Sequence, residues 1–497
     1  MSTSASIARP ELAGSLRDSG GILLVSCYEL GHQPLGIGAS AAFLRRAGFD
    51  PASLDLSVEP FDAERAARAR LVAISVPMHT ALRLGLRAAQ EVRAVNPRAH
   101  VCFHGLYAAL NAGWLLEHGA DSAIGGESEA PLVALAEALD AGRAPEVEGV
   151  SVLGRVLGPH LARLDFPAPA RDLMPPLAKY ARIERDGQRG LAGSVEASRG
   201  CRHLCLHCPI PPAYGGRFFA VPRETVLEDI RQLAALGATH ITFADPDFLN
   251  APTHSLRIVR AMHEAMPAVT FDFTAKIEHV IEHRAIFPEL AGCGALFMVS
   301  AVESFSDVVL GHLEKGHTRA DVFAALAVLR GAGIAMRPSL VAFTPWTTLE
   351  DYLEMLRVVE AEDLVDHLDS VQFTIRLLVP PGSLLLQRDA IRPHLGAFDP
   401  NAFGYPWTHP DPRMDALYEA VRARVAASTR EGEDARLTFA RLVALARAAA
   451  GLPEVPVREA GATPRRGVPR LTEPWFCCAE PSEDQFGPRP TAGRPAL

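Results

Sequence analysis

Three cysteines stand close together near the middle of the chain, at Cys201, Cys205 and Cys208. Thiolates spaced Cys-x3-Cys-x2-Cys on one loop can ligate three corners of a cuboidal four-iron cluster. The fourth iron then lacks a protein ligand and is open to a substrate. The alternative is a zinc site, for which His203 or His207 would supply the fourth ligand.

Two more cysteines, Cys477 and Cys478, are adjacent in a tail that is rich in proline. Clustered thiols of this kind favour metal ligation in a reducing compartment over a disulfide framework. Adjacent thiols can bind a soft metal, reduce a radical intermediate or hold a substrate covalently. The alternative is that both side chains simply pack under Trp475.

Strand and helix patterns alternate in the first part of the chain. Apolar runs at 22–25, 71–76 and 100–103 predict strands, and 39–47 and 80–95 predict helices between them. This order predicts an open, parallel, doubly wound sheet, whose ligands bind beyond the carboxyl ends of the strands.

A second series of strand and helix patterns follows the first, with the cysteine loop directly after its first strand. The expected strands are each followed by a helix-length segment, and they cover 193–198, 240–245, 270–275, 295–301, 334–343 and 370–379. Six such units predict a closed or partial parallel barrel with its active site at the carboxyl ends of the strands.

The cysteine loop at this position resembles the radical S-adenosylmethionine (SAM) superfamily. The resemblance implies a [4Fe-4S] cluster at Cys201, Cys205 and Cys208, with SAM chelated to the open iron and cleaved to a deoxyadenosyl radical. It also implies an electron donor such as a flavodoxin or ferredoxin.

The same resemblance implies SAM contacts at the carboxyl ends of the barrel strands. His207 matches the position that lies against adenine, and Asp245 or Asp247 matches the position that accepts from the SAM ammonium group. Glu303 matches a residue that contacts SAM polar groups. Helix capping is an equal alternative for the two aspartates. Arg337 and Arg376 lie inside apolar runs, where a guanidinium needs an anion, either a SAM or substrate carboxylate or a structural salt bridge.

The front domain resembles the cobalamin-binding domains of radical SAM proteins. Its candidate cofactor contacts lie at strand ends or in the loops after them: Gly36, Gly38, Ser75, Gly125, Gly126 and Glu127. The chain has no Asp-x-His-x-x-Gly motif for an axial histidine, and the neighbours of His32 do not fit one. The alternative is a Rossmann-like domain that binds no ligand.

The tail sequence Cys477-Cys478-Ala479-Glu480-Pro481 resembles that of radical SAM proteins with a CUAEP/CCAEP tail. Their first tail position is selenocysteine or cysteine, so Cys477 and Cys478 are candidate catalytic residues.

The composition of the chain disfavours some classes of binding partner and some cellular locations. The 497 residues are 48% hydrophobic with a formal charge of -9, which disfavours nucleic acid as a partner. The sequence has neither a membrane-length apolar run nor a signal peptide, so we expect a cytoplasmic protein.

The expected organisation is α/β. A Rossmann-like domain of cobalamin-binding type is followed by a partial (β/α)6 radical SAM barrel and a helical or irregular C-terminal region. The expected segments are an arm at 1–20, the Rossmann-like domain at 21–142, a linker at 143–190, the barrel at 191–385, a helical region at 386–452 and the tail at 453–497.

The predicted function is cobalamin-assisted modification of an unactivated centre in a small molecule or peptide, with methyl transfer the leading outcome. One alternative is radical SAM group transfer or rearrangement without working cobalamin, assisted by the tail thiols. Another is a zinc-binding or metalloid-sensing protein that is not an enzyme.

Overall fold

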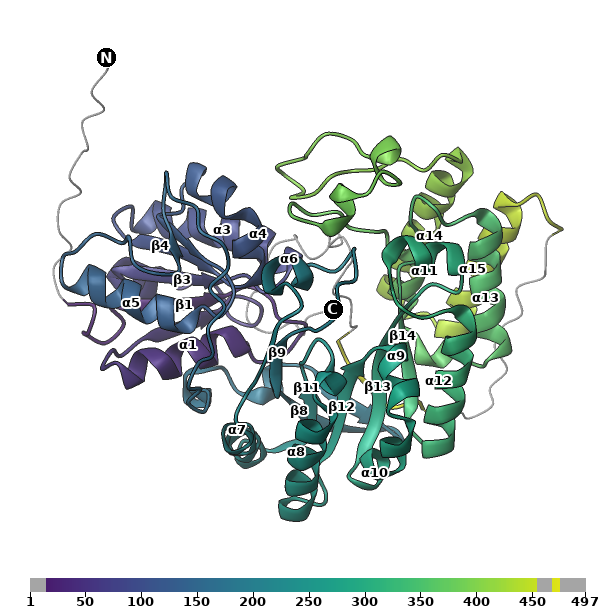
Figure 1. The fold of residues 1–497 in the computed structure, drawn as a ribbon, viewed down its shortest axis with the longest axis horizontal. Coiled ribbons are helices and arrows are strands. Elements are labelled where there is room, and N and C mark those ends of the chain that lie inside the picture. The colour runs from purple at the N-terminus through teal and green to yellow at the C-terminus, as the bar shows by residue number, and fades with distance from the viewer. Residues whose placement is uncertain (1–14, 454–466, 474–497) are drawn as a thin grey trace. The chain divides into compact units, whose positions relative to one another are not determined.

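The computed structural model describes residues 15–453 and 467–473 (Figure 1). Cys477 and Cys478 lie outside this range. The described chain forms two compact units, the first within 15–175 and the second from residue 176 onward. The short segment Leu30–Gln33 belongs to the second unit, where the carbonyl oxygen of Gly31 accepts from the backbone N–H of Ala181 at 2.8 Å.

The first unit contains a six-stranded sheet in the order β2-β1-β3-β4-β5-β6, parallel except for β6. Its strands are β1 Ile22–Ser26, β2 Ala52–Asp55, β3 Leu71–Ser75, β4 His100–His104, β5 Ser122–Ile124 and β6 Val150–Ser151. Its helices are α1 Leu35–Arg46, α2 Ala63–Arg68, α3 His79–Val95, α4 Leu106–Glu117 and α5 Glu129–Asp140.

The predicted doubly wound fold of the first unit is confirmed. Helices α1 and α5 lie on one face of the sheet and α3 and α4 on the other (Figure 1). Strands β1 and β3 are fully buried, as apolar strands covered on both faces must be. The chain reverses direction across the sheet between β1 and β3, which is where doubly wound folds bind their ligands.

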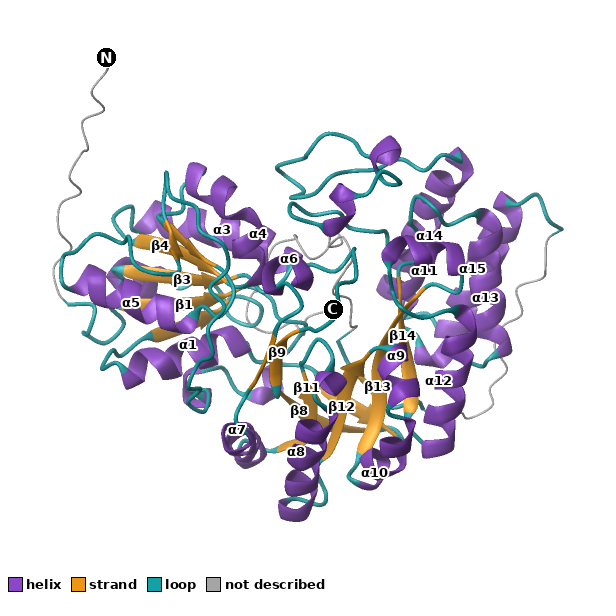
Figure 2. Ribbon diagram, in the orientation of Figure 1, coloured by secondary structure: helices purple, strands orange, loops and turns teal. Residues whose placement is uncertain are grey.

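The second unit contains a seven-stranded sheet in the order β14-β13-β12-β11-β8-β7-β15. Strands β8 Gln188–Val195, β11 Ala238–Phe243, β12 Thr270–Ala275, β13 Ala295–Glu303 and β14 Ala335–Leu340 are parallel. Helices α7 Arg223–Ala235, α8 Pro252–Ala265, α10 Phe287–Gly292 and α12 Arg319–Ala332 line the outside of this curved sheet (Figure 2). Five of the six expected barrel strands are therefore present.

The sixth expected strand, at 370–379, is wrong as a strand. A short 3-10 helix covers Ser370–Thr374, and only one parallel bridge, between Phe343 and Arg376, remains. The side-chain oxygen of Gln372 accepts from the N–H of Leu340 at 2.9 Å. The side-chain amide of Gln372 thus takes the place of the backbone carbonyl that a sixth strand would offer to this N–H at the edge of β14.

The expected linker at 143–190 differs from the structure at both of its ends. Its first part contains β6, and its last part contains β7 Arg182–Arg185 and the start of β8. Strand β15 Arg470–Leu471 pairs antiparallel with β7, and Arg470 contacts Glu184 at 2.9 Å. One segment of the Pro-rich tail therefore forms the edge of the sheet.

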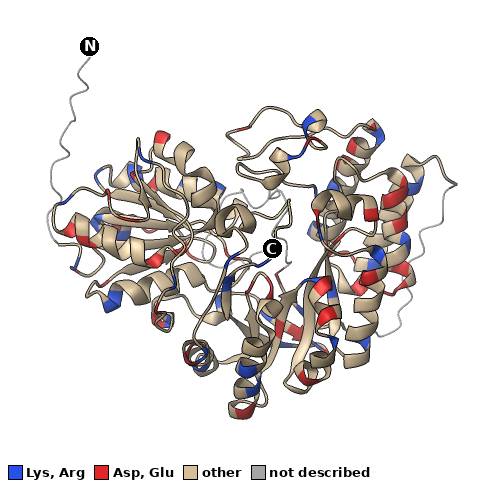
Figure 3. Cartoon of the chain, viewed as in Figure 1, with Lys and Arg blue, Asp and Glu red and all other residues tan. Residues whose placement is uncertain are grey.

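The predicted C-terminal helices are confirmed as α14 Pro412–Glu431 and α15 Ala435–Ala449. Acidic and basic residues are interspersed over the outer helices of this unit (Figure 3). Ion pairs such as Arg436 with Asp366, at 2.8 Å, connect them to neighbouring segments. Among the described residues, no helix is both long and apolar enough to cross a membrane.

Two glycines of the first unit make a matched test of backbone strain. Gly126 has a φ of +75°, and an added Cβ would lie 2.3 Å from the carbonyl oxygen of His160. Gly113, inside α4, has no atom within 4 Å of an added Cβ. We expect Gly126→Ala to destabilise the fold by at least about 1–2 kcal/mol, whereas Gly113→Ala should be neutral or stabilising by up to about 1 kcal/mol. Chemical unfolding of both variants measures this difference, and equal midpoints would contradict it.

Candidate functional site

The three cysteines of the predicted cluster follow β9 Ser198–Gly200 on one loop of the second unit. Cys201 and Cys205 are buried and Cys208 is partly exposed. The N–H of Cys208 donates to the carbonyl oxygen of Cys205 at 3.2 Å. Burial raises the pKa of Cys201, and the nearby Cys205 raises it further. The thiols of Cys201 and Cys205 therefore lie within electrostatic reach of each other, in a setting that favours a metal-bound thiolate over a free one.

Asp245 fixes the backbone that leads into the cysteine loop. Its two carboxyl oxygens accept from the N–H of Ala197 at 2.9 Å and from the hydroxyl of Ser198 at 2.5 Å. Burial raises the pKa of Asp245 to about 7, although both hydrogen bonds oppose that shift. The resemblance implied that Asp245 or Asp247 meets the SAM ammonium group. In the structure, both oxygens of Asp245 bind the chain's own loop.

Other contacts hold the cysteine loop from further along its length. The side-chain oxygen of Asn250 accepts from the N–H of Arg202 at 3.3 Å and lies 3.9 Å from the sulfur of Cys201. The N–H of Leu206 donates to the carbonyl oxygen of Leu313 at 3.1 Å. An irregular loop is thereby tied to segments that follow β11 and β13.

Glu303 lies at the centre of a buried charged group beside the loop. Its Oε1 is 3.2 Å from Nε2 of His207 and 3.2 Å from Nζ of Lys315. Burial opposes ionisation of Glu303, but Lys315 and His207 outweigh it and lower its pKa to about 2. Burial also opposes the charge on Lys315, yet Glu303, Cys205 and Cys208 raise its pKa. An ammonium group therefore lies within electrostatic reach of two of the three predicted cluster thiols.

The backbone at Glu303 is unusual for a residue with a side chain. Its φ is +64°, a conformation that costs roughly 1–2 kcal/mol outside glycine. The register between β13 and β14 also shifts between Ala301 and Glu303. Conformations of this kind are concentrated at functional sites.

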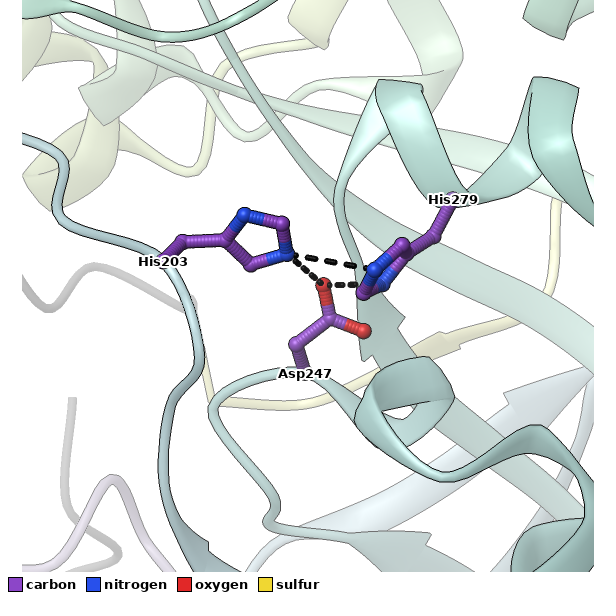
Figure 4. Close-up of side chains that lie close together, drawn as sticks. All are labelled: His203, Asp247 and His279. Atoms are coloured by element: carbon purple, nitrogen blue, oxygen red, sulfur yellow. Dashed lines mark hydrogen bonds and ion pairs between the residues drawn. The ribbon is translucent and has the colours of Figure 1, made fainter. Parts of the chain in front are cut away.

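A second polar group follows β11 and β12 and contains Asp247, His203 and His279 (Figure 4). Nδ1 of His279 lies 2.9 Å from Oδ2 of Asp247, and Nε2 of His203 lies 3.2 Å from Nε2 of His279. Lys276 contacts Nδ1 of His203 at 3.1 Å and Glu278 at 2.8 Å. Asp247 also accepts from the N–H of Leu249 at 2.9 Å, so the alternative role as a cap is present as well.

The two arginines inside apolar runs each meet a protein carboxylate. Arg337 contacts Asp369 at 3.0 Å, and Arg376 contacts Asp415 at 3.0 Å. The guanidinium carbon of Arg376 also lies 3.6 Å from the ring centre of Trp407. Each arginine thus has a structural ion pair, while Nη1 of Arg337 is buried without a hydrogen-bond partner among the described residues.

The candidate residues of the first unit divide into two groups. Ser75 and Gly36 lie at the ligand-binding edge, where a Cβ on Gly36 would come within 2.4 Å of the Ser75 hydroxyl. Ser26 pairs with Ser75 in the sheet register, and its buried hydroxyl has no hydrogen-bond partner among the described residues. A polar group placed over this edge could satisfy that hydroxyl.

The other glycines of this unit are explained by packing within the protein. A Cβ on Gly38 would meet Met174 at 2.6 Å, and one on Gly125 would meet Ala109 at 2.3 Å. Gly126 approaches His160, as described above. Glu127 is fully buried, and its N–H donates to the carbonyl oxygen of His160 at 2.8 Å.

Family comparisons match both units. Residues 21–136 match the B12 binding domain, and residues 195–359 match the Radical SAM superfamily. The chain combines a B12-binding domain with a radical SAM domain. The fold class expected from the sequence is confirmed, and so is its resemblance to cobalamin-binding radical SAM proteins.

Individual relatives cover parts of the chain. Hopanoid C-3 methylase of Methylococcus capsulatus is 28% identical over 324 residues, which are 63% of this chain and 62% of the methylase. A tRNA-2-methylthio-N(6)-dimethylallyladenosine synthase of Chlorobium phaeobacteroides is 27% identical over 191 residues, 36% of this chain and 42% of the synthase. The chain thus spans less than two thirds of the length of these relatives.

Two solved structures share the fold. The cobalamin-dependent SAM radical enzyme OxsB, with aqua-cobalamin and SAM bound, matches with a TM-score of 0.66 and 17% identity over 82% of this chain and 67% of OxsB. The radical SAM methyltransferase TsrM of Kitasatospora setae, with cobalamin and a [4Fe-4S] cluster bound, matches with a TM-score of 0.56 and 20% identity, over 69% of this chain and 70% of TsrM.

The radical SAM domain implies a [4Fe-4S] cluster and SAM, and the B12-binding domain implies cobalamin. The residues present fit both. Three thiols on one loop beside the ammonium group of Lys315 suit an anionic cluster with one open iron. The unsatisfied hydroxyl of Ser26 at the β1 and β3 edge suits a polar cofactor in the first unit.

Several site residues were not singled out from the sequence: Asn250, Lys276, Glu278 and His279. Lys276 and His279 come directly after the predicted strand at 270–275, where a parallel barrel places functional side chains. Their position after a barrel strand could therefore have identified them from the sequence. No sequence pattern identifies Asn250, because its contact with Arg202 depends on the folded path of the loop.

The titration of Asp245 gives a test of its role in the loop. The carboxyl group ionises near pH 3.8 when exposed and near pH 7 in the fold. Between these values the folded chain holds one proton more than the unfolded chain, so this group's contribution to stability falls as pH rises. We expect the free energy of unfolding of the wild type, relative to that of Asp245→Asn, to fall from pH 4 to pH 7 and then level off. Unfolding midpoints of both proteins across that pH range measure this difference, and a difference that stays constant with pH would contradict the prediction.

Proposed function

We propose that this chain is a cobalamin-dependent radical SAM enzyme that transfers a methyl group to an unactivated carbon of a small molecule. The observation that carries the proposal is the three-cysteine loop at the carboxyl ends of the barrel strands, beside the buried Glu303 and Lys315 pair. The B12-binding domain supports cobalamin, and the similarity to hopanoid C-3 methylase supports methyl transfer.

In this proposal the protein side chains hold and orient the reactants. Cys201, Cys205 and Cys208 ligate three irons, and Asp245 keeps the loop in place. Glu303 and Lys315 would pair with the ammonium and carboxylate groups of SAM. When bound, the cluster supplies the electron that cleaves SAM, and cobalamin supplies a methyl carrier.

In the same proposal His207 lies against the adenine of SAM. Its Nδ1 is buried and has no hydrogen-bond partner among the described residues, while Nε2 contacts Glu303 at 3.2 Å. A ring nitrogen without a partner is available to a ligand.

In the first unit, we place the cofactor at the edge formed by Gly36, Ser75 and Ser26. Gly38, Gly125, Gly126 and Glu127 shape the domain through contacts with the protein itself, and so act on the cofactor indirectly. A radical SAM enzyme needs an external reductant, for which we propose a flavodoxin or ferredoxin in the reducing cytoplasm.

The cluster assignment predicts a difference between two cysteine variants. After anaerobic reconstitution, the wild type should hold about four iron and four sulfide per chain and cleave SAM to deoxyadenosine when reduced. Cys208→Ala should lose the cluster and reduce cleavage to background. Cys293→Ala, which removes a buried thiol outside the loop, should retain both. Tightly bound zinc without SAM cleavage would favour the non-enzyme alternative.

A second candidate function, radical group transfer assisted by the tail thiols, is favoured by the position of β15. Strand β7 is antiparallel to both β8 and β15, so β15 runs in the same direction as β8. Strand β15 therefore runs toward the edge from which the cysteine loop emerges, and Leu471 is level with Gly190, five residues before the end of β8. Cys477 is six residues further, a span of at most about 20 Å when extended. The end of β8 lies about 17 Å further along the strand direction and about 10 Å to the side, roughly 19 Å in all, which an extended segment can just span.

This candidate predicts that the tail thiols are needed after SAM cleavage. The Cys477→Ala and Cys478→Ala variants should cleave SAM at the wild-type rate but lose the transferred product, as measured by mass analysis of reaction mixtures. In the methyl transfer proposal both variants still form methylated product. An unchanged product yield would therefore exclude the tail-assisted reaction.

A further inference from the structure

Three potential metal ligands converge beside the cysteine loop without being part of it (Figure 4). His203 lies in the loop itself, Asp247 follows β11, and His279 lies in α9 Ile277–Glu282 after β12. One ligand atom from each residue lies within 4.8 Å of the other two. Two imidazoles and one carboxylate form a ligand set that binds divalent transition metals and leaves coordination positions open.

The spacing of these atoms is close to that of the ligands of one ion. Nδ1 of His279 lies 2.9 Å from Oδ2 of Asp247, yet it makes no aligned hydrogen bond with any residue that the structure describes. Ligand atoms that surround one ion at about 2.1 Å lie roughly 3.0–3.4 Å apart. Nε2 of His203 lies 3.9 Å from Oδ2 of Asp247, so the His203 ring moves inward by a fraction of an ångström when the ion binds.

Burial strengthens the case for a ligand at this position. Asp247 is fully buried and His279 is 4% exposed. A polar nitrogen that is buried without a hydrogen bond destabilises the fold by about 1–3 kcal/mol. Coordination of a metal ion would satisfy Nδ1 of His279 and balance the charge of Asp247.

We propose that His203, Asp247 and His279 bind one divalent transition-metal ion, separate from the iron–sulfur cluster. His203 would bind through Nε2 and His279 through Nδ1, so the 3.2 Å contact between their Nε2 atoms gives way to the ion, and the ring proton of His203 lies on Nδ1. Oε2 of Glu278 lies 3.8 Å from that nitrogen, and a shift of less than 1 Å brings it within hydrogen-bond distance, as carboxylates beside metal-bound histidines are. Lys276 then releases His203 and keeps its 2.8 Å contact with Glu278.

The proposed ion joins three separate segments of the radical SAM domain: the cysteine loop, the segment after β11 and helix α9. Its charge would lie next to the cluster loop. The site does not depend on the proposed methyl transfer, because it can bind a metal whether or not SAM is cleaved.

A neighbouring group offers a matched control. His279, Glu282 and His283 also place ligand atoms close together, but they come from α9 and the residue directly after it, and Glu282 is exposed. His279 is common to both groups. His203 and His283 each belong to one group only, so their variants distinguish the two.

Zinc is the probe, since elemental analysis separates it from the iron of the cluster. The full chain, reconstituted with iron and sulfide, is dialysed against zinc, washed, and analysed for zinc, iron and sulfide. We expect about one zinc ion per chain in addition to an intact cluster. X-ray absorption at the zinc edge should show nitrogen and oxygen neighbours without sulfur.

The variants locate the site. His203→Ala and His279→Ala should lose the zinc and keep the iron and sulfide, whereas His283→Ala should keep all three. Glu278→Gln should weaken zinc binding by roughly 10–100-fold. Sulfur neighbours at the zinc edge, zinc retained in His203→Ala, or no zinc bound by the wild type would each overturn the proposal.

Discussion

The structure depends on one constraint: an irregular eight-residue loop must present three thiolates to one cluster. Conformational entropy opposes that arrangement, at roughly 1–2 kcal/mol for each ordered residue. The loop has little secondary structure to hold it, and the ends of the barrel strands supply the contacts instead. Asp245 fixes the entry to the loop, Asn250 fixes Arg202, and the carbonyl oxygen of Leu313 fixes Leu206. The parallel sheet matters because it brings these segments, far apart in sequence, to one edge.

Charge is arranged around the loop in two buried groups. Glu303 holds Lys315 and His207 on one side, and Asp247 holds His279 on the other. A buried pair of this kind contributes little to stability, but removing one partner costs several kcal/mol. Together with the left-handed backbone at Glu303, these groups mark a site that is maintained for binding. The first unit is simpler, since its binding edge follows from the point where the strand order reverses.

Much of the fold could be predicted because its strands are continuous apolar runs buried on both faces. The wrong predictions have identifiable physical causes. The run at 370–379 is equally apolar, but Gln372 satisfies the edge of β14 through its side chain. Strand β15 has two residues, and its pairing with β7 joins segments almost 300 residues apart, which no local pattern encodes. The cysteine loop could be singled out from its spacing and its place after a strand, and its three thiols remain predicted cluster ligands. The partners of Asp245, and the convergence of His203 with His279, are tertiary contacts between loops and could not.

The central claim is that Cys201, Cys205 and Cys208 hold a four-iron cluster whose fourth iron is open to SAM. Mössbauer spectroscopy of the chain reconstituted with iron-57, recorded with and without SAM, tests it directly. The account predicts that SAM changes the signal of one iron in four, because only that iron gains nitrogen and oxygen ligands. A spectrum of four irons that SAM leaves unchanged would contradict it.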